Sequence, residues 1–177
     1  MPVILVLLAA VLLAISVLVG AARRSEYSHR RHTISELGER GSVFEGAFSW
    51  GIFLPTGLLL AAAGLMTLNS DPPAAALALC IAAGYLSAAV FPCDVGSPLG
   101  GSWRQAWHNI GGAVQYLGGA LSLMLVAETD GPAFRFAGMG VGAIAILISF
   151  PGPVRGALQR AAEVLLFSGL VAALLRT

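Results

Sequence analysis

The chain has 177 residues, of which 57% are hydrophobic and only 11% charged, and its mean hydropathy is +0.83. These values exclude an ordinary soluble domain and are typical of an integral membrane protein. The formal net charge is +1, but all ten basic residues are arginines and five of them lie between Arg23 and Arg40. The placement of charge is therefore more informative than its sum, and nothing in it indicates a nucleic-acid partner.

The first apolar run, Pro2–Ala22, has no positive residue before it and is followed directly by Arg23 and Arg24. This arrangement favours a retained membrane-spanning helix over a cleaved signal peptide. Hydropathy predicts six spans in all, and each is expected to be a helix because lipid offers no partner to backbone polar groups. The predicted spans are Pro2–Ala22, Gly46–Leu68, Pro73–Phe91, Gln105–Ala127, Ala133–Phe150 and Gly156–Leu175. We predict an all-α, polytopic bundle of six transmembrane helices that forms a single domain over residues 1–177.

Six crossings place the first, third and fifth connections on one side of the membrane and both termini on the other. The arginines on the side of the odd-numbered connections are Arg23, Arg24, Arg30, Arg31, Arg40, Arg104, Arg155 and Arg160. Because cytoplasmic loops are enriched in Arg and Lys, this side is predicted to be cytoplasmic, with both termini outside. The expected location is the cell membrane, crossed several times.

The polar residues that are hardest to explain as solvated loop fall at this same end of the predicted bundle. They come from the first and third connections and from the adjoining ends of the fourth and sixth spans. Gln115 follows His108 by seven residues and so shares its helical face. The predicted ligand-binding residues are His29, Arg30, Arg31, His32, Ser35, Glu36, Asp94, His108, Asn109, Gln159, Arg160 and Glu163.

Ionisable groups inside a membrane helix are costly unless they are paired or hydrated, so His108, Arg160 and Glu163 are candidates for a functional role. A structural alternative stays open for the sixth span. Glu163 could pair with Arg160 three residues earlier on the same helix, or with an arginine of the first connection, and act only as a polar lock.

A metal site is a second alternative. His29 and His32 would lie on one side of a helical turn, and His108 with Asp94 would complete four nitrogen and oxygen ligands for zinc. Glu36 would then act as a base, so the catalytic candidates are Glu36, His108 and Asp94. Short His-x-x-His motifs arise readily by chance, and a solvated or anion-binding basic segment is the preferred interpretation. No cofactor or metal is favoured, although zinc is possible.

The basic first connection suits a membrane surface. Arginines at the level of the headgroups attract anionic lipid, and guanidinium pairs with phosphate through two hydrogen bonds. Thr33 and Glu36 have the spacing of a capping box, which predicts a short helix starting beside the site. The N-terminus of that helix could face an anion.

The polar segments together resemble a known family. Tyr-Ser-His-Arg-Arg-His-Thr-Ile-Ser-Glu-Leu-Gly at 27–38, Phe-Pro-Cys-Asp at 91–94, the His-Asn and Gly-Gly pairs at 108–112 and Gly-Ala-Leu-Gln-Arg at 156–160 are similar to a prokaryotic six-helix family known as domain of unknown function 998. The chain also resembles, more distantly, the eukaryotic Frag, Sfk and damage-regulated autophagy modulator membrane proteins. That resemblance implies a role in lipid remodelling or phosphoinositide organisation, and it implies an exoplasmic first loop, opposite to the orientation that the arginines predict.

The expected function is binding of an anionic or phosphorylated lipid headgroup in a polar pocket open at one leaflet. The alternatives are a metal-dependent intramembrane enzyme that processes lipid, and a structural subunit of a membrane complex. Membrane lipid is the expected partner, while catalytic competence and oligomeric state stay open.

Overall fold

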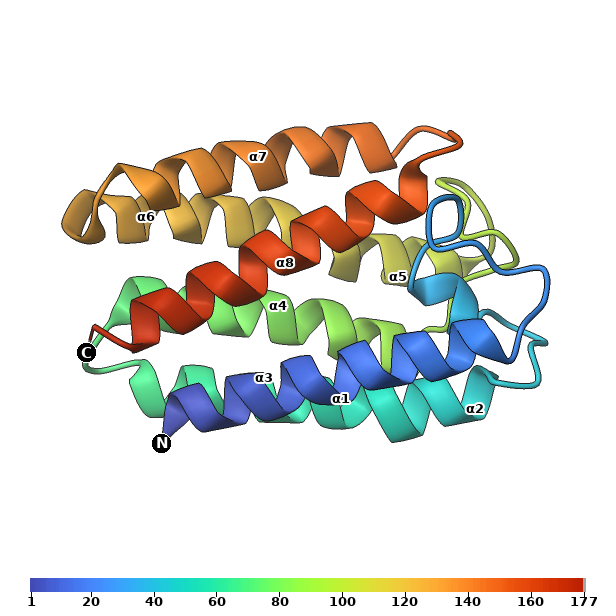
Figure 1. Cartoon of the computed structure of the whole chain (residues 1–177), viewed down its shortest axis with the longest axis horizontal. Helices are drawn as coiled ribbons and strands as arrows, with labels where there is room; N and C mark the ends of the chain where they lie inside the picture. The colour runs from blue at the N-terminus through green and yellow to red at the C-terminus, as the bar shows by residue number, and fades with distance from the viewer. Residues whose placement is uncertain (177) are drawn as a thin grey trace.

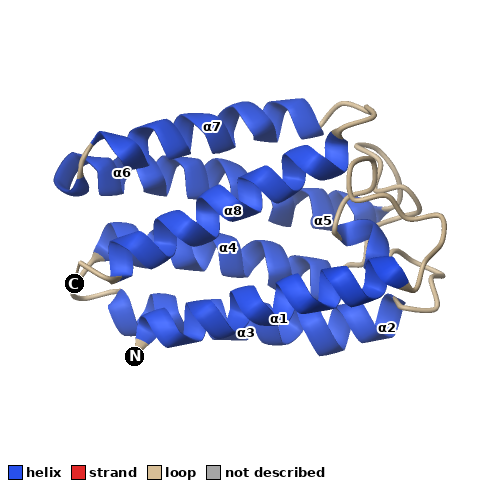
Figure 2. Cartoon of the chain, in the orientation of Figure 1, coloured by secondary structure: helices blue, strands red, loops and turns tan. Residues whose placement is uncertain are grey.

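The computed structural model describes residues 1–176 and is built from helices that run along one common direction, with both termini at the same end (Figure 1). Five helical segments are long and apolar enough to cross a membrane. The remaining apolar helix, Pro132–Ile148, has 17 residues and is shorter. The longer loops gather at the end opposite the termini (Figure 2). The predicted all-α six-helix bundle is confirmed. The helices are α1 (Pro2–Ala22), α2 (Glu45–Phe48), α3 (Leu54–Thr67), α4 (Pro72–Val90), α5 (Trp103–Ala113), α6 (Gly119–Asp130), α7 (Pro132–Ile148) and α8 (Arg155–Leu174).

Two of the spans contain a π-helical turn that hydropathy does not predict. The turn η2 (Ser49–Phe53) joins α2 to α3, and η3 (Val114–Gly118) joins α5 to α6, so each span stays continuous. A π turn adds about one residue to a helical turn and is frequent at functional sites. In η3 it carries Gln115 and Tyr116, both of which are buried.

Local sequence explains where several helices begin. The carboxylate of Asp71 accepts a hydrogen bond from the backbone N–H of Ala74 at 3.0 Å, and Pro72 occupies the first turn of α4, where its missing N–H costs nothing. Ser102 caps α5 by accepting from the N–H of Gln105 at 3.3 Å. Gly131, with a φ of 102°, makes the turn before α7. The short links between spans are thus fixed by caps and turns.

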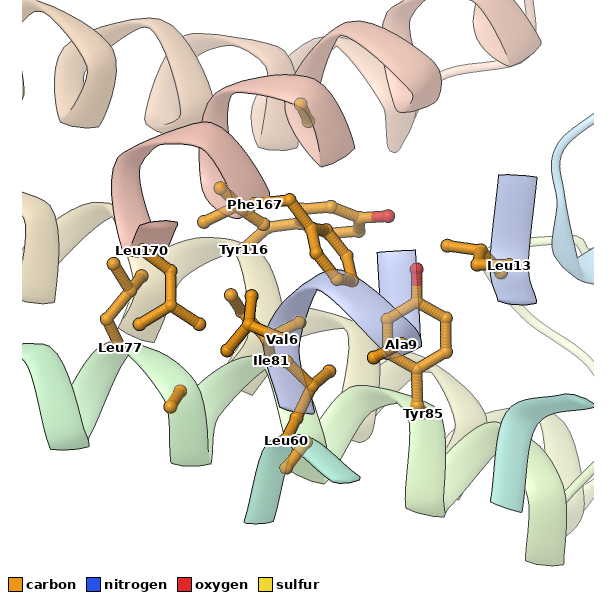
Figure 3. Packing of buried hydrophobic residues seen from close by; sticks show 14 of the residues in the cluster. Val6, Ala9, Leu13, Leu60, Leu77, Ile81, Tyr85, Tyr116, Phe167 and Leu170 are labelled. Atoms are coloured by element: carbon orange, nitrogen blue, oxygen red, sulfur yellow. The ribbon is translucent and has the colours of Figure 1, made fainter. Parts of the chain in front are cut away.

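The core is apolar and is shared by most of the helices. Val6 of α1, Leu60 of α3, Ile81 of α4 and Leu170 of α8 are all fully buried and lie close together at the centre of the bundle (Figure 3). The outer faces are also apolar, as at Leu121, which is 62% exposed. A bundle that is apolar both inside and outside is suited to a lipid environment, as the composition predicted.

The three odd-numbered connections meet at the loop end of the bundle, as predicted. The backbone N–H of Arg40 in the first connection donates to the carbonyl of Cys93 in the third at 2.9 Å. Arg155, which follows the fifth connection, donates to the carbonyl of Ser97 at 2.6 Å. The N–H of Ala157 donates to the carbonyl of Arg30 at 3.0 Å. The first connection is therefore folded onto the bundle instead of extending away from it.

Candidate functional site

A cavity of about 280 Å³ lies at the loop end, and we call it the site cavity. It is bounded by the first connection, the π turn η3 with the end of α5, the C-terminal end of α7 and the first half of α8. Exposed apolar side chains, among them Leu99, Leu117 and Ile146, lie among its lining residues. Of the twelve predicted ligand-binding residues, the site cavity brings together Ser35, His108, Asn109, Gln159 and Glu163.

Ser35 and His108 form a hydrogen-bonded pair in the wall of the site cavity. The Nε2 atom of His108 lies 3.1 Å from the Oγ of Ser35, and its Nδ1 lies 2.9 Å from the carbonyl oxygen of Phe91. A carbonyl can only accept, so we assign the ring proton of the neutral imidazole to Nδ1. Nε2 then presents its lone pair to the Ser35 hydroxyl, which donates to it.

The first connection positions Ser35 through a set of local bonds. The N–H of Thr33 donates to Oε1 of Glu36 at 2.8 Å, and the N–H of Glu36 lies 3.4 Å from the hydroxyl of Thr33. These reciprocal bonds confirm the predicted capping box. The helix that they begin, η1 (Ser35–Gly38), is a single 3₁₀ turn. It is too short for the anion-binding terminus that the sequence suggested.

Glu163 is buried and sits among neutral partners. Its carboxylate oxygens lie 2.7 Å from Nε2 of Gln115, 2.7 Å from the hydroxyl of Tyr116 and 2.8 Å from the hydroxyl of Tyr85. The two tyrosine rings belong to the apolar cluster of Figure 3. Gly84 makes room for this arrangement, because a Cβ atom there would lie 2.0 Å from Oε1 of Gln115.

The alternative in which Glu163 forms an ion pair with Arg160 or with an arginine of the first connection is not what the structure shows. Within residues 1–176, Glu163 takes part in no ion pair at all. The guanidinium of Arg160 instead donates to the carbonyls of His29 at 2.9 Å and His32 at 3.1 Å and to the hydroxyl of Tyr27 at 2.6 Å. Arg160 therefore fastens the first connection to α8 and does not line the site cavity.

A chain of hydrogen bonds links the first connection to Glu163. The backbone N–H of Ile34 donates to Oε1 of Gln159 at 2.6 Å, and Nε2 of Gln159 donates to the hydroxyl of Tyr116 at 3.1 Å. Because Tyr116 accepts from Gln159, its own proton is directed to Glu163. The position of the loop and the interior network are thus physically connected.

Several of the predicted ligand-binding residues lie outside the site cavity. His29, Arg30 and Arg31 are exposed on the first connection, and Nδ1 of His32 accepts from the N–H of Ser28 at 3.0 Å. Among residues 1–176, no three His, Cys, Asp or Glu side chains come together in a group that could hold a metal. The zinc ligands of the alternative metal site, His29, His32, Asp94 and His108, are therefore not brought together, because they face different partners.

Asp94 organises the third connection. Its carboxylate accepts from the N–H of Ser102 at 2.7 Å, from the hydroxyl of Ser102 at 2.9 Å and from the guanidinium of Arg40 at 3.1 Å. The backbone hydrogen bond from Ser102 is the largest cause that holds the pKa of Asp94 below its usual value. The hydroxyl of Ser102 and then the guanidinium of Arg40 lower this pKa further. The neighbouring Cys93 is a free, buried thiol whose pKa is raised to about 12, chiefly by burial. Neither Asp94 nor Glu36 lines the site cavity, so neither is placed as a catalytic group there.

Sequence reasoning missed four residues that shape the site. Tyr85 and Tyr116 lie within long apolar runs, and Arg155 was counted only among the arginines that predict the orientation. Gln105 is fully buried and accepts from the N–H of Asp94 at 2.7 Å. A buried Tyr or Gln is expected to have a hydrogen-bond partner, and this expectation was the available signal for three of the four.

The apolar bundle, the buried carboxylate and the polar cavity at one end define a multi-pass α-helical membrane protein with a potential ligand site. A family model matches residues 7–176, and the chain belongs to that family, which is described as protein of unknown function (DUF998). No curated protein and no solved structure matches the chain. The more distant resemblance to the eukaryotic membrane proteins stays a prediction.

Proposed function

We propose that the protein binds a membrane lipid in the site cavity, with an anionic or phosphorylated headgroup at the loop end. The observation that carries this proposal is the mixed lining of the cavity. Polar groups such as Ser35 and Asn109 line it together with Leu117 and Ile146, which are apolar and exposed on the outer faces of their helices. A lipid likewise combines a polar headgroup with apolar acyl chains.

The expected sign of the headgroup follows from Arg155. Its guanidinium donates to the carbonyls of Ile148 at 2.9 Å, Gly96 at 3.1 Å and Ser97 at 2.6 Å. Within residues 1–176 no carboxylate pairs with it, so its charge is available to an anion. Glu163 is eight residues further along α8, about 12 Å by helical rise, so the anionic group belongs at the Arg155 end.

The loop end carries an excess of positive charge that suits an anionic leaflet. Eight arginines lie there, in the loops and in the adjoining helix ends, against five acidic residues in the loops and at the start of α2. The acidic residues are Glu26, Glu36, Glu39, Glu45 and Asp94. Juxtamembrane arginines are attracted to the negative cytoplasmic leaflet of a cell membrane. We therefore orient the site cavity toward the cytoplasmic leaflet of the cell membrane, with both termini outside.

The test fills the site cavity without disturbing its walls. Gly112 lines the cavity, and a Cβ atom added there would meet no atom within 4 Å. Gly112→Phe is therefore expected to occupy space that a lipid would use. Gly51→Phe is the matched control, because Gly51 is an exposed helical glycine with equally open surroundings and lies outside the cavity.

Both variants and the wild type would be purified and exchanged into mixtures of phosphatidylglycerol and phosphatidylcholine, and retained lipid would be measured by native mass spectrometry. The wild type and Gly51→Phe should retain phosphatidylglycerol in preference to phosphatidylcholine, and Gly112→Phe should lose that lipid. Equal retention by Gly112→Phe would contradict the assignment of the site. Equal retention of the two lipids by the wild type would contradict the anionic headgroup.

A further inference from the structure

The site cavity contains a nucleophile beside a base. Ser35 Oγ makes its one hydrogen bond within residues 1–176 to Nε2 of His108, at 3.1 Å. The other ring nitrogen is held by the carbonyl of Phe91 at 2.9 Å, which fixes both the tautomer and the orientation of the ring. A hydroxyl, a base within hydrogen-bond reach and a third group that orients the base are the geometric requirements for covalent catalysis by serine.

The surroundings of this pair give it access to a substrate. Ser35 and His108 both line the site cavity, and neither side chain is fully buried. Contacts to the neighbouring backbone groups fix the position of Ser35. The preceding N–H of Ile34 is bonded to Gln159, and the thiol of Cys93 lies 3.4 Å from the carbonyl oxygen of Ser35. The nucleophile is thus presented by a positioned segment and not by a free loop.

The depth of the pair indicates which bond it would meet. Ser35 lies in the first connection, which the proposed lipid binding puts at the level of the headgroups, and His108 lies in the second turn of α5, where the span begins. The carboxylic ester bonds of a membrane lipid lie at this boundary, between the headgroup and the hydrocarbon of the bilayer. We propose that Ser35 and His108 are a catalytic pair that cleaves a carboxylic ester of the lipid held in the site cavity, an inference that rests on the proposed lipid binding.

The reaction balances with water as the second substrate. Ser35 Oγ attacks the ester carbonyl carbon while His108 Nε2 takes the hydroxyl proton. The bond from the carbonyl carbon to the lipid alcohol breaks, and the alcohol leaves with the proton from His108, so that an acyl ester of Ser35 remains. Water then attacks this ester, His108 accepts its proton, and a fatty acid is released as the Ser35 hydroxyl is restored.

The first test starts from the wild-type protein. Wild-type protein in nanodiscs would be treated with an alkyl fluorophosphonate, which reacts with activated serines, and the adduct located by peptide mass spectrometry. We expect an adduct on Ser35, and a rate of labelling about 100-fold lower in His108→Gln, since general-base catalysis contributes at least this much. Ser168 is the internal control, because it is an exposed serine of α8 that, within residues 1–176, bonds to carbonyls of its own helix. Labelling of Ser35 no faster than that of Ser168 would overturn the proposal.

The second test measures the products. Nanodiscs with acyl-labelled phosphatidylglycerol should release fatty acid with the wild type and with Ser168→Ala, and release should fall about 100-fold or more in Ser35→Ala. Retained lipid is measured in the same samples, and release is expressed per molecule of lipid retained, so that a loss of cleavage is distinguished from a loss of binding. Release that persists in Ser35→Ala, or no release by a wild type that retains lipid, would overturn the catalytic pair and leave lipid binding intact. Retained lipid that is unaffected in Gly112→Phe would instead contradict the binding proposal.

Discussion

Gly156 controls how the first connection packs on α8. A Cβ atom at this position would lie 2.2 Å from the carbonyl oxygen of His32 and 2.7 Å from that of His29. Both neighbours are backbone atoms, so Gly156→Ala must lift the loop or shift the helix. Lifting the loop also weakens the bond from the N–H of Ala157 to the carbonyl of Arg30. Overpacking of this kind costs about 1–3 kcal/mol, which raises the open population of the loop roughly 5- to 150-fold.

Limited proteolysis measures this opening, because trypsin cleaves after the exposed Arg30 and Arg31 once the loop leaves the bundle. When opening is fast relative to cleavage, the rate of cleavage follows the open population. Gly152→Ala is the matched control, because a Cβ atom at this exposed glycine of the fifth connection would meet nothing within 4 Å. Cleavage of Gly156→Ala at the wild-type rate, with Gly152→Ala also unchanged, would refute the close approach as the reason for a glycine here.

Three further predictions concern the interior, the third connection and the orientation. Glu163→Leu leaves three buried donors without an acceptor, which costs about 1–3 kcal/mol for each donor. The free energy of unfolding measured by SDS titration should therefore fall by roughly 3 kcal/mol or more in this variant, and by about 1 kcal/mol in Glu163→Gln, which keeps an acceptor. Similar losses in the two variants would show that the hydrogen bonds to Glu163 matter little. Cys93 should resist N-ethylmaleimide at pH 8 in the folded protein and react after denaturation, since burial raises its pKa to about 12 and the thiolate is the reactive form; rapid labelling of the folded protein would contradict this. A cysteine at Val43, which is 91% exposed on the first connection, should escape a membrane-impermeant thiol reagent in intact cells and react after permeabilisation; labelling of intact cells would reverse the proposed orientation.

The architecture was largely predictable because a bilayer allows few kinds of membrane-spanning structure. Apolar length gave the number of helices, and the parity of the crossings placed His108 and Gln159 at the same end as the first connection. The spacing of Thr33 and Glu36 correctly indicated a capping box, since that motif depends only on local backbone geometry. These features need no knowledge of how helices pack against one another.

The contacts within the site were less predictable because they depend on helix rotation and on backbone partners. The π turn at η3 changes which side chains face inward, and no hydropathy pattern reveals it. Arg160 was expected to bind an anionic ligand, with a pair to Glu163 as the alternative, yet it donates to the carbonyls of a loop 128 or more residues away in sequence. Sequence patterns indicate charges well and backbone acceptors poorly, because every residue carries a carbonyl.

The 17 residues of α7 have a consequence for the membrane around the protein. At 1.5 Å per residue this helix is about 25 Å long, whereas the hydrocarbon layer of a typical bilayer is about 30 Å thick. A bilayer meets a short span by thinning locally, at a modest energetic cost. The end of α7 at Ile148 is also a wall of the site cavity, so we expect the bilayer to thin beside the cavity. Under the proposed lipid binding, a headgroup at this place would sit closer to the bilayer midplane than its neighbours and would have a shorter way to Arg155.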